Sequence, residues 1–160
     1  MNEWQGFFIA QVGASAALTG LLFVGISINL ARILAVPMLA DLAVAALFLL
    51  SAVLVGSSLM LVPGQSLLVM GLEMLLMGLV AWVVISVLDV NIWKHSDFKY
   101  RGGSALLILF NQIAVLSYAI AGVILLLGNL AGVYWLVPAV LFSFIEALWN
   151  AWLLLVEINR

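Results

Sequence analysis

The sequence predicts an all-α membrane protein, a bundle of five transmembrane helices in a single domain that covers residues 1–160. Apolar residues make up 68% of the chain and charged residues only 8%, against about 45–50% and about 25% in soluble domains. Such a chain has too few polar side chains to cover a surface that faces water. Its apolar runs reach the length of about 20 residues that crosses a bilayer. The lipid bilayer is therefore the first expected partner.

Five segments carry this signal, and the backbone of each must be helical because hydrocarbon offers it no hydrogen-bond partner. The predicted spans are residues 7–30, 41–62, 67–89, 104–127 and 134–156. Residues that end helices separate them, namely Arg32 and Pro37, the turn Pro63–Gly64–Gln65, the polar run from Lys94 to Gly103, and the pair Gly128–Asn129. The pieces between the spans are too short to hold a second folded domain.

The basic residues predict how the bundle is oriented. With five crossings, all of them fall on one side of the membrane, and they are Arg32, Lys94, Lys99, Arg101 and Arg160. Basic loops stay in the cytoplasm, so the N-terminus is expected outside and the C-terminus inside. The first residues lack the basic region of a cleavable signal peptide, so the first span is expected to remain in the mature protein.

Several classes of function have no support in the sequence. The chain has no cysteine and one histidine, His95, which is expected to be a solvated loop residue beside Lys94. We expect no metal site and no cofactor. The net charge of −2 gives no sign of a nucleic-acid partner. The chain contains no nucleophile triad, zinc-binding HExxH motif, phosphate loop or dinucleotide fingerprint, and we expect no enzymatic activity.

The first span is rich in small residues at helical spacing. Gly6, Gly13 and Gly20 recur every seven residues, and Ala17 lies beside their line. Small residues let two membrane helices approach closely. We therefore expect this face to pack tightly, either inside the protomer or between subunits of a homo-oligomer, with a ligand groove as the alternative.

The same segment, FFIAQVGASAALTGLLFVGISINL, resembles the opening of a group of small, uncharacterised bacterial multi-span proteins, some of which carry labels such as protease modulator. The resemblance covers about 25 residues. It implies a multi-pass protein of the bacterial inner membrane and assigns no function to any residue.

Two carboxyl groups are predicted to lie inside the membrane, where ionisable residues are costly and by default suggest function. Glu146 falls near the middle of the fifth span, and Glu73 lies six residues into the third. Asp41 is expected to open the second helix. Asp89 is expected to end the third near the surface, within reach of Arg32 or Lys94.

Depth matching predicts a buried polar cluster built from the first, fourth and fifth spans. Ser143, Glu146 and Asn150 share one face of the fifth span. The further expected members, from the first and fourth spans, are Thr19, Asn111, Gln112 and Tyr118. These groups either join the helices through ordinary hydrogen bonds or form a site. A carboxyl group away from water is hard to ionise, which is a property that a proton-binding site uses.

Three functions remain open at this point. The first is a small oligomeric channel or transporter in which a proton or cation passes Glu146, Asn150, Asn111 and Gln112, with Glu73 near the outer mouth. The second is a non-enzymatic scaffold or regulatory subunit that binds another membrane protein through the first span. The third is binding of a lipid or quinone near Trp149 and Trp152.

The predicted orientation can be tested by cysteine labelling, because the natural chain has no cysteine. A single cysteine introduced near Lys99 should resist a membrane-impermeant thiol reagent in whole cells and react after the cells are opened. A cysteine at Gln65 should react in whole cells and serves as the control. Labelling near Lys99 from outside would contradict the orientation.

Overall fold

The computed structural model describes residues 2–95 and 101–158. Every regular element within these residues is helical. The elements are α1 (Asn2–Ile28), α2 (Leu30–Ala35), α3 (Pro37–Met60), α4 (Leu67–His95), α5 (Arg101–Leu126), the 3₁₀ helix η2 (Leu130–Trp135) and α6 (Leu136–Ile158). Five of them (α1, α3, α4, α5 and α6) are long and apolar enough to cross a membrane. This confirms the predicted all-α bundle of five spans.

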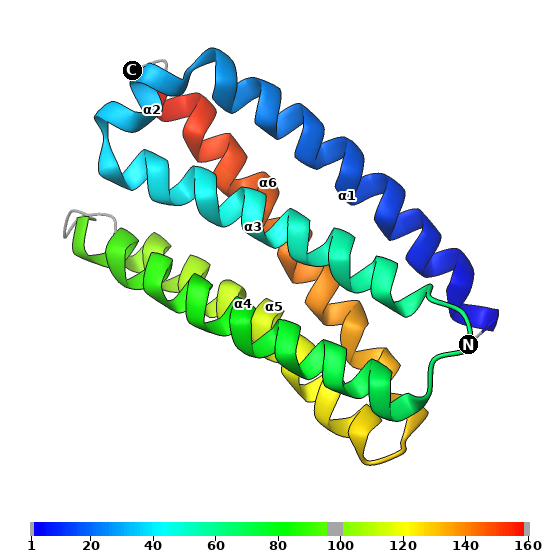
Figure 1. Cartoon of the computed structure of the whole chain (residues 1–160). Coiled ribbons are helices and arrows are strands. Elements are labelled where there is room, and N and C mark those ends of the chain that lie inside the picture. Colours follow the sequence, from blue (N-terminus) through cyan, green and yellow to red (C-terminus); the bar gives the residue numbers. More distant parts are fainter. Residues whose placement is uncertain (1, 96–100, 159–160) are drawn as a thin grey trace.

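Figure 1 shows the two ends of the chain at opposite ends of the bundle, as an odd number of crossings requires. The short helix α2, the end of α4, the start of α5 and the end of α6 lie together at the left. These elements contain or adjoin the basic residues, so we call this the basic end of the bundle. It contains Arg32 of α2, Lys94 of α4 and Arg101 of α5. The predicted grouping of the basic residues is confirmed for these three. Lys99 and Arg160 lie outside the described residues.

Several predicted boundaries are wrong, and the reasons are local. Pro37 begins α3 instead of interrupting the chain before it, because a proline at the first helical position loses no hydrogen bond. Asp41 consequently lies in the second turn of α3. The link before it contains α2, which was not predicted. The turn between α3 and α4 is confirmed, and there Gly64 adopts a positive φ of 76° that other residues rarely adopt.

The largest boundary error concerns α4, which continues to His95 instead of ending at residue 89. His95 is therefore the last residue of a helix and not part of a loop. Asp89 lies well inside the same helix, more than one turn before its end. The helix continues because no proline or glycine follows Asp89 before residue 96.

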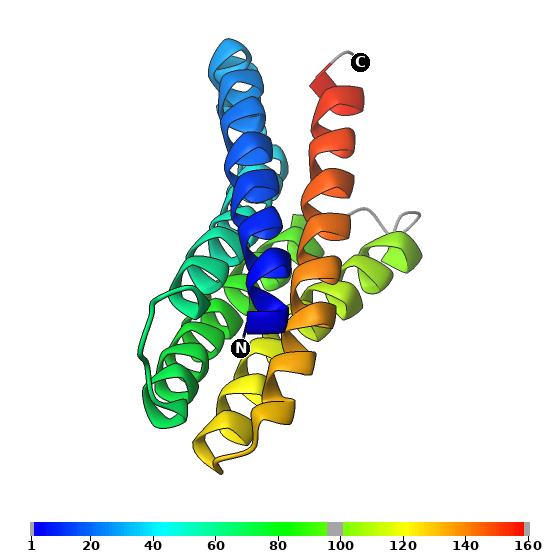
Figure 2. The same ribbon diagram turned by 90° about the vertical axis from the view of Figure 1, so that its right-hand side faces the viewer.

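The arrangement of the spans follows from which helices touch. The α4–α5 pair makes the most extensive contact in the bundle. Helices α3 and α6 pack on each other. Helix α3 also contacts α1 and α4, and α6 also contacts α5 and the preceding helix η2. Helix α1 is the most peripheral span: 11% of the residues in its most apolar stretch are buried, against 50% for α3. Figure 1 shows α1 along the upper edge of the bundle, and Figure 2, which is turned by 90°, shows it in front of α3.

The closest helix approach involves glycines of α4 and α5. A Cβ atom at Gly78 would lie 2.5 Å from the backbone nitrogen of Ala119, and one at Gly122 would lie 2.4 Å from that of Leu75. Gly71 faces Leu126 equally closely. Only glycine allows two backbones to come this near. The sequence analysis placed the close helix contact on the first span and did not predict the contact between α4 and α5.

The small residues of α1 instead face outward. Gly6, Gly13, Ala17 and Gly20 are all exposed. A Cβ atom added at any of the three glycines would meet nothing within 4 Å in the described chain. Tight packing of this face inside the protomer is therefore wrong, and contact between subunits stays a prediction. Helix α1 uses its other side, which includes the buried Phe8 and Ser15, to pack on the bundle.

We expect Gly78→Ala to destabilise the protein, because its methyl group would overlap the backbone of α5. Overpacking of this kind typically costs about 1–3 kcal/mol. Gly13→Ala is the matched control: its methyl group points into open space, and alanine is the better helix former by about 1 kcal/mol. Unfolding of the purified protein in detergent measures both. Equal losses would contradict the assignment of the close contact to α4 and α5.

Candidate functional site

The centre of the candidate site is Glu146, near the middle of the 23-residue helix α6. Its side chain is 0% exposed. The expected shelter for this carboxyl group is therefore confirmed. Neither carboxyl oxygen makes a hydrogen bond to any described residue. A buried carboxyl group in this position needs a proton or a cation to offset the cost of leaving water.

The predicted polar face of α6 is confirmed. Ser143 and Asn150, one turn on either side of Glu146, are also buried. Ser143 donates its hydroxyl hydrogen to the carbonyl oxygen of Ala139 in the same helix, at 2.7 Å. The side-chain nitrogen of Asn150 has no partner among the described residues. This face therefore contains both a bonded hydroxyl group and unused hydrogen-bonding capacity.

Helix α5 supplies a second buried face, as predicted, with Asn111 and Tyr118 two turns apart. The Tyr118 side chain lies next to Ser143 of α6. Ser143 already donates its hydroxyl hydrogen to Ala139, and the Tyr118 hydroxyl group makes no hydrogen bond of ordinary geometry within the described chain. The two helices are in contact, so their polar faces meet in the core.

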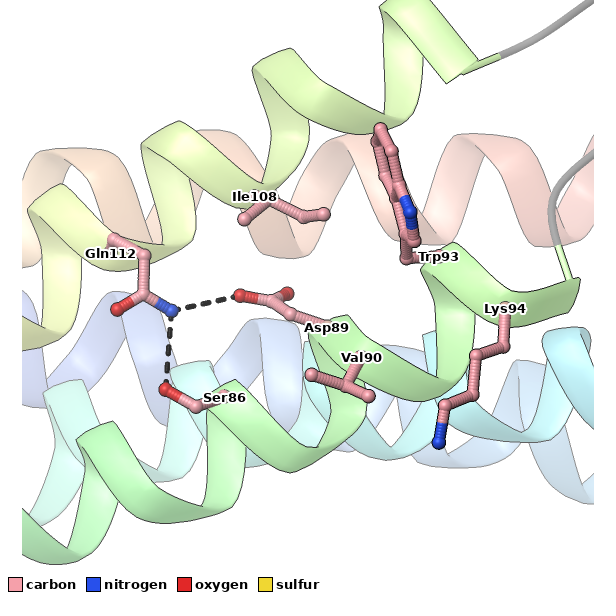
Figure 3. Close-up of a pocket in the computed structure, with 7 residues that line it drawn as sticks. All are labelled: Ser86, Asp89, Val90, Trp93, Lys94, Ile108 and Gln112. Carbon is pink, nitrogen blue, oxygen red and sulfur yellow. Dashed lines mark hydrogen bonds between the residues drawn. The ribbon is translucent and has the colours of Figure 1, made fainter. Parts of the chain in front are cut away.

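Asp89 of α4 is the member of the cluster that the sequence analysis missed. Its side chain is only 4% exposed. Asn111 donates its amide N–H to Oδ1 of Asp89 at 2.8 Å, and Gln112 donates to Oδ2 at 3.0 Å. Gln112 also reaches Ser86 Oγ at 3.3 Å. Figure 3 shows Gln112 bonded to both side chains across the gap between α4 and α5.

This arrangement corrects the expectation that Asp89 pairs with Arg32 or Lys94 near the surface. In Figure 3 the Lys94 side chain points away from Asp89, although both belong to α4. The error follows from the helix boundary: because α4 continues to His95, Asp89 faces α5 and not the loop. The polar residues Asn111 and Gln112, which lie 22 and 23 positions after Asp89, could have indicated this pairing. Only the packing of α4 on α5 shows that these residues meet Asp89.

The carboxyl groups of Asp89 and Glu146 are close enough to interact electrostatically. The cluster therefore joins α4, α5 and α6, and not the first, fourth and fifth spans as predicted. Unused hydrogen-bonding atoms are concentrated in it: Asn111 Oδ1, Tyr118 Oη, Glu146 Oε1 and Oε2, and Asn150 Nδ2. Each buried unsatisfied atom typically costs about 1–3 kcal/mol. Such a cost is more typical of a functional site than of groups that only join helices.

Two predicted members lie elsewhere. Thr19 donates its hydroxyl hydrogen to the carbonyl oxygen of Ser15 in its own helix, at 2.7 Å. Glu73 is partly buried near the other end of α4, where Gln65 donates to its two oxygens at 3.0 and 2.9 Å. Glu73 lies 16 positions before Asp89 on α4. This spacing places the two residues about 24 Å apart along the helix axis. Neither residue belongs to the cluster.

The expected aromatic cleft is not found at its predicted place. Trp149 and Trp152 are 52% and 60% exposed. A groove of about 230 Å³ does lie beside α6, but aliphatic side chains of α1 and α6 form most of it and neither tryptophan lines it. No group of three or more residues that could hold a metal ion occurs within the described residues.

No family model, no curated protein and no solved structure matches this chain. The resemblance of the first span to small bacterial membrane proteins thus receives no support from these comparisons. What the findings support is a multi-pass membrane protein with five candidate spans. Its buried cluster is the basis for any more specific function.

Proposed function

We propose that this protein moves protons or small monovalent cations across a membrane, with Glu146 as the group that binds the ion. The observation that carries the proposal is the complete burial of an unpartnered carboxyl group in the middle of α6. A group that only joined helices would be expected to use its hydrogen bonds.

The neighbours of Glu146 support this function by their unused capacity. Asn150 can only donate from its free nitrogen, Asn111 can only accept at its free oxygen, and Tyr118 can do both. A chain of such groups can pass a proton or offer oxygen atoms to a cation as side chains rotate. It leads from the centre of the bundle toward Asp89 and the basic end.

The other half of the core is apolar. Between Tyr118 and the end that carries the α3–α4 turn, the buried side chains are mostly aliphatic or methionine, including Met60, Met70, Met74 and Leu125. The side chains in this apolar half of the core would have to move apart for an ion to cross the membrane. The polar cluster lies inside one protomer, so the proposed binding site does not itself need an oligomer.

We expect Glu146→Gln to lower proton flux at least about tenfold, because the amide cannot carry the proton. The measurement is a pH-sensitive dye trapped in proteoliposomes, with a potassium diffusion potential as the driving force. Glu73→Gln is the matched control, since Glu73 has an ordinary partner in Gln65. Equal flux in the wild type and Glu146→Gln would remove Glu146 from the mechanism.

A second candidate function is a scaffold that associates with another membrane protein or with a second copy of itself. The observation that favours it is the outward stripe of small residues on α1, where a Cβ atom added at Gly13 or Gly20 would meet nothing within 4 Å in the described chain. Such a stripe allows close approach of another helix. Both candidates are non-enzymatic. The proposed location is the bacterial inner membrane, which rests on the resemblance of the first span alone.

For this second candidate, we expect Ala17→Cys to form a disulfide-linked dimer in membranes, because Ala17 lies in the stripe. Phe23→Cys is the control: it is also exposed, but lies roughly 120° around the helix. Adding Gly13→Leu to the Ala17→Cys variant should abolish the cross-link. Equal cross-linking at both positions would show that the stripe is not the interface between copies.

A further inference from the structure

A pocket of about 300 Å³ opens between α4 and α5 near the basic end of the bundle. Figure 3 shows its lining, which comes from two turns of α4 and the facing turns of α5. The residues are Ser86, Asp89, Val90, Trp93, Lys94, Ile108 and Gln112. Glu146 does not line this pocket. The pocket is therefore distinct from the proposed ion-binding site at Glu146.

Asp89 gives the pocket its charge. The carboxyl group is almost completely buried, and Asn111 and Gln112 hold it in place. Both of these partners are neutral amides, so they fix the position of the carboxylate without compensating its charge. A carboxylate has about four lone-pair positions, and two hydrogen bonds leave further ones free. Lys94 also lines the pocket, but its side chain points away from Asp89, so the Asp89 carboxyl group is the one that faces a cation entering from the open side.

The remaining walls select the kind of cation. Trp93 lies one turn beyond Asp89 on α4, and Val90 and Ile108 provide aliphatic surface. Ca²⁺ and Mg²⁺ are held by six or more oxygen ligands, which this largely apolar lining does not supply. A tryptophan ring beside a carboxylate instead suits an ammonium group with methyl or methylene substituents. The volume lies at the lower end of the range for ligand pockets, which favours a small group.

We propose that this pocket binds an organic ammonium group, with Asp89 as its counter-ion, Trp93 as the aromatic wall, and Val90 and Ile108 in contact with its apolar substituents. The group can belong to a free amine or to a lipid headgroup, because the pocket lies close to the end of α4. The inference does not depend on proton movement through Glu146.

The test measures binding of radiolabelled tetramethylammonium to the full chain in dodecyl maltoside, a detergent without an ammonium group. We expect saturable binding at one site per chain. Asp89→Asn should weaken it more than about tenfold, since a buried charge loses its partner. Trp93→Leu should weaken it about 2- to 30-fold, and Trp93→Phe less. Trp82→Leu is the matched control, because Trp82 is exposed on the same helix outside the pocket.

Two further arms separate the possible outcomes. Glu146→Gln should weaken tetramethylammonium binding less than Asp89→Asn does, because Glu146 does not line the pocket, so loss of proton flux and loss of ammonium binding can be told apart. If added phosphatidylethanolamine competes with tetramethylammonium and phosphatidylglycerol does not, the ammonium group is that of a lipid headgroup. If neither lipid competes, it is that of a free amine. Absence of saturable binding, wild-type binding by Asp89→Asn, or equal effects of Trp93→Leu and Trp82→Leu would overturn the proposal.

Discussion

Hydrocarbon cannot solvate a carboxyl group, and this constraint governs which helices cover Glu146. The residue lies in the middle of α6 and is completely buried. Its neighbours along the helix are buried with it, so α6 must turn this face toward α3 and α5, the long helices that it contacts. Had the face turned outward, the membrane would have met a carboxyl group near its midplane at a cost of several kcal/mol.

The glycines of α4 and α5 make the rest of the cluster possible. Gly71, Gly78 and Gly122 bring the two backbones together in the half of the bundle that contains the α3–α4 turn. Toward the basic end this pair of helices is instead separated by side chains, and Asn111 and Gln112 reach across to Asp89. The pocket lies in that same region. One pair of helices therefore provides both the closest contact and a ligand-sized opening.

The core has two chemically different halves. The half nearer the basic end holds Asp89, Asn111 and Asn150 beside an aliphatic cluster that includes Leu42 and Ile92, while the other half is dominated by aliphatic and methionine side chains. An ion that entered from the basic end would find polar groups as far as Glu146 and an apolar barrier beyond. This asymmetry fits a protein whose two membrane faces are not equivalent, and it does not require a pore along an oligomer axis.

The sequence by itself determined the class of protein, the number of spans and the burial of Glu146, Ser143 and Asn150, because hydropathy and helical periodicity are local properties. It also placed Asn111 and Tyr118 on one buried face. Only the tertiary structure decided that Asp89 joins them, that Thr19 and Glu73 do not, and that α1 exposes its glycines while α4 and α5 use theirs. The reason is physical: helical spacing fixes which residues share a face, but which helix covers that face depends on packing between segments far apart in the chain.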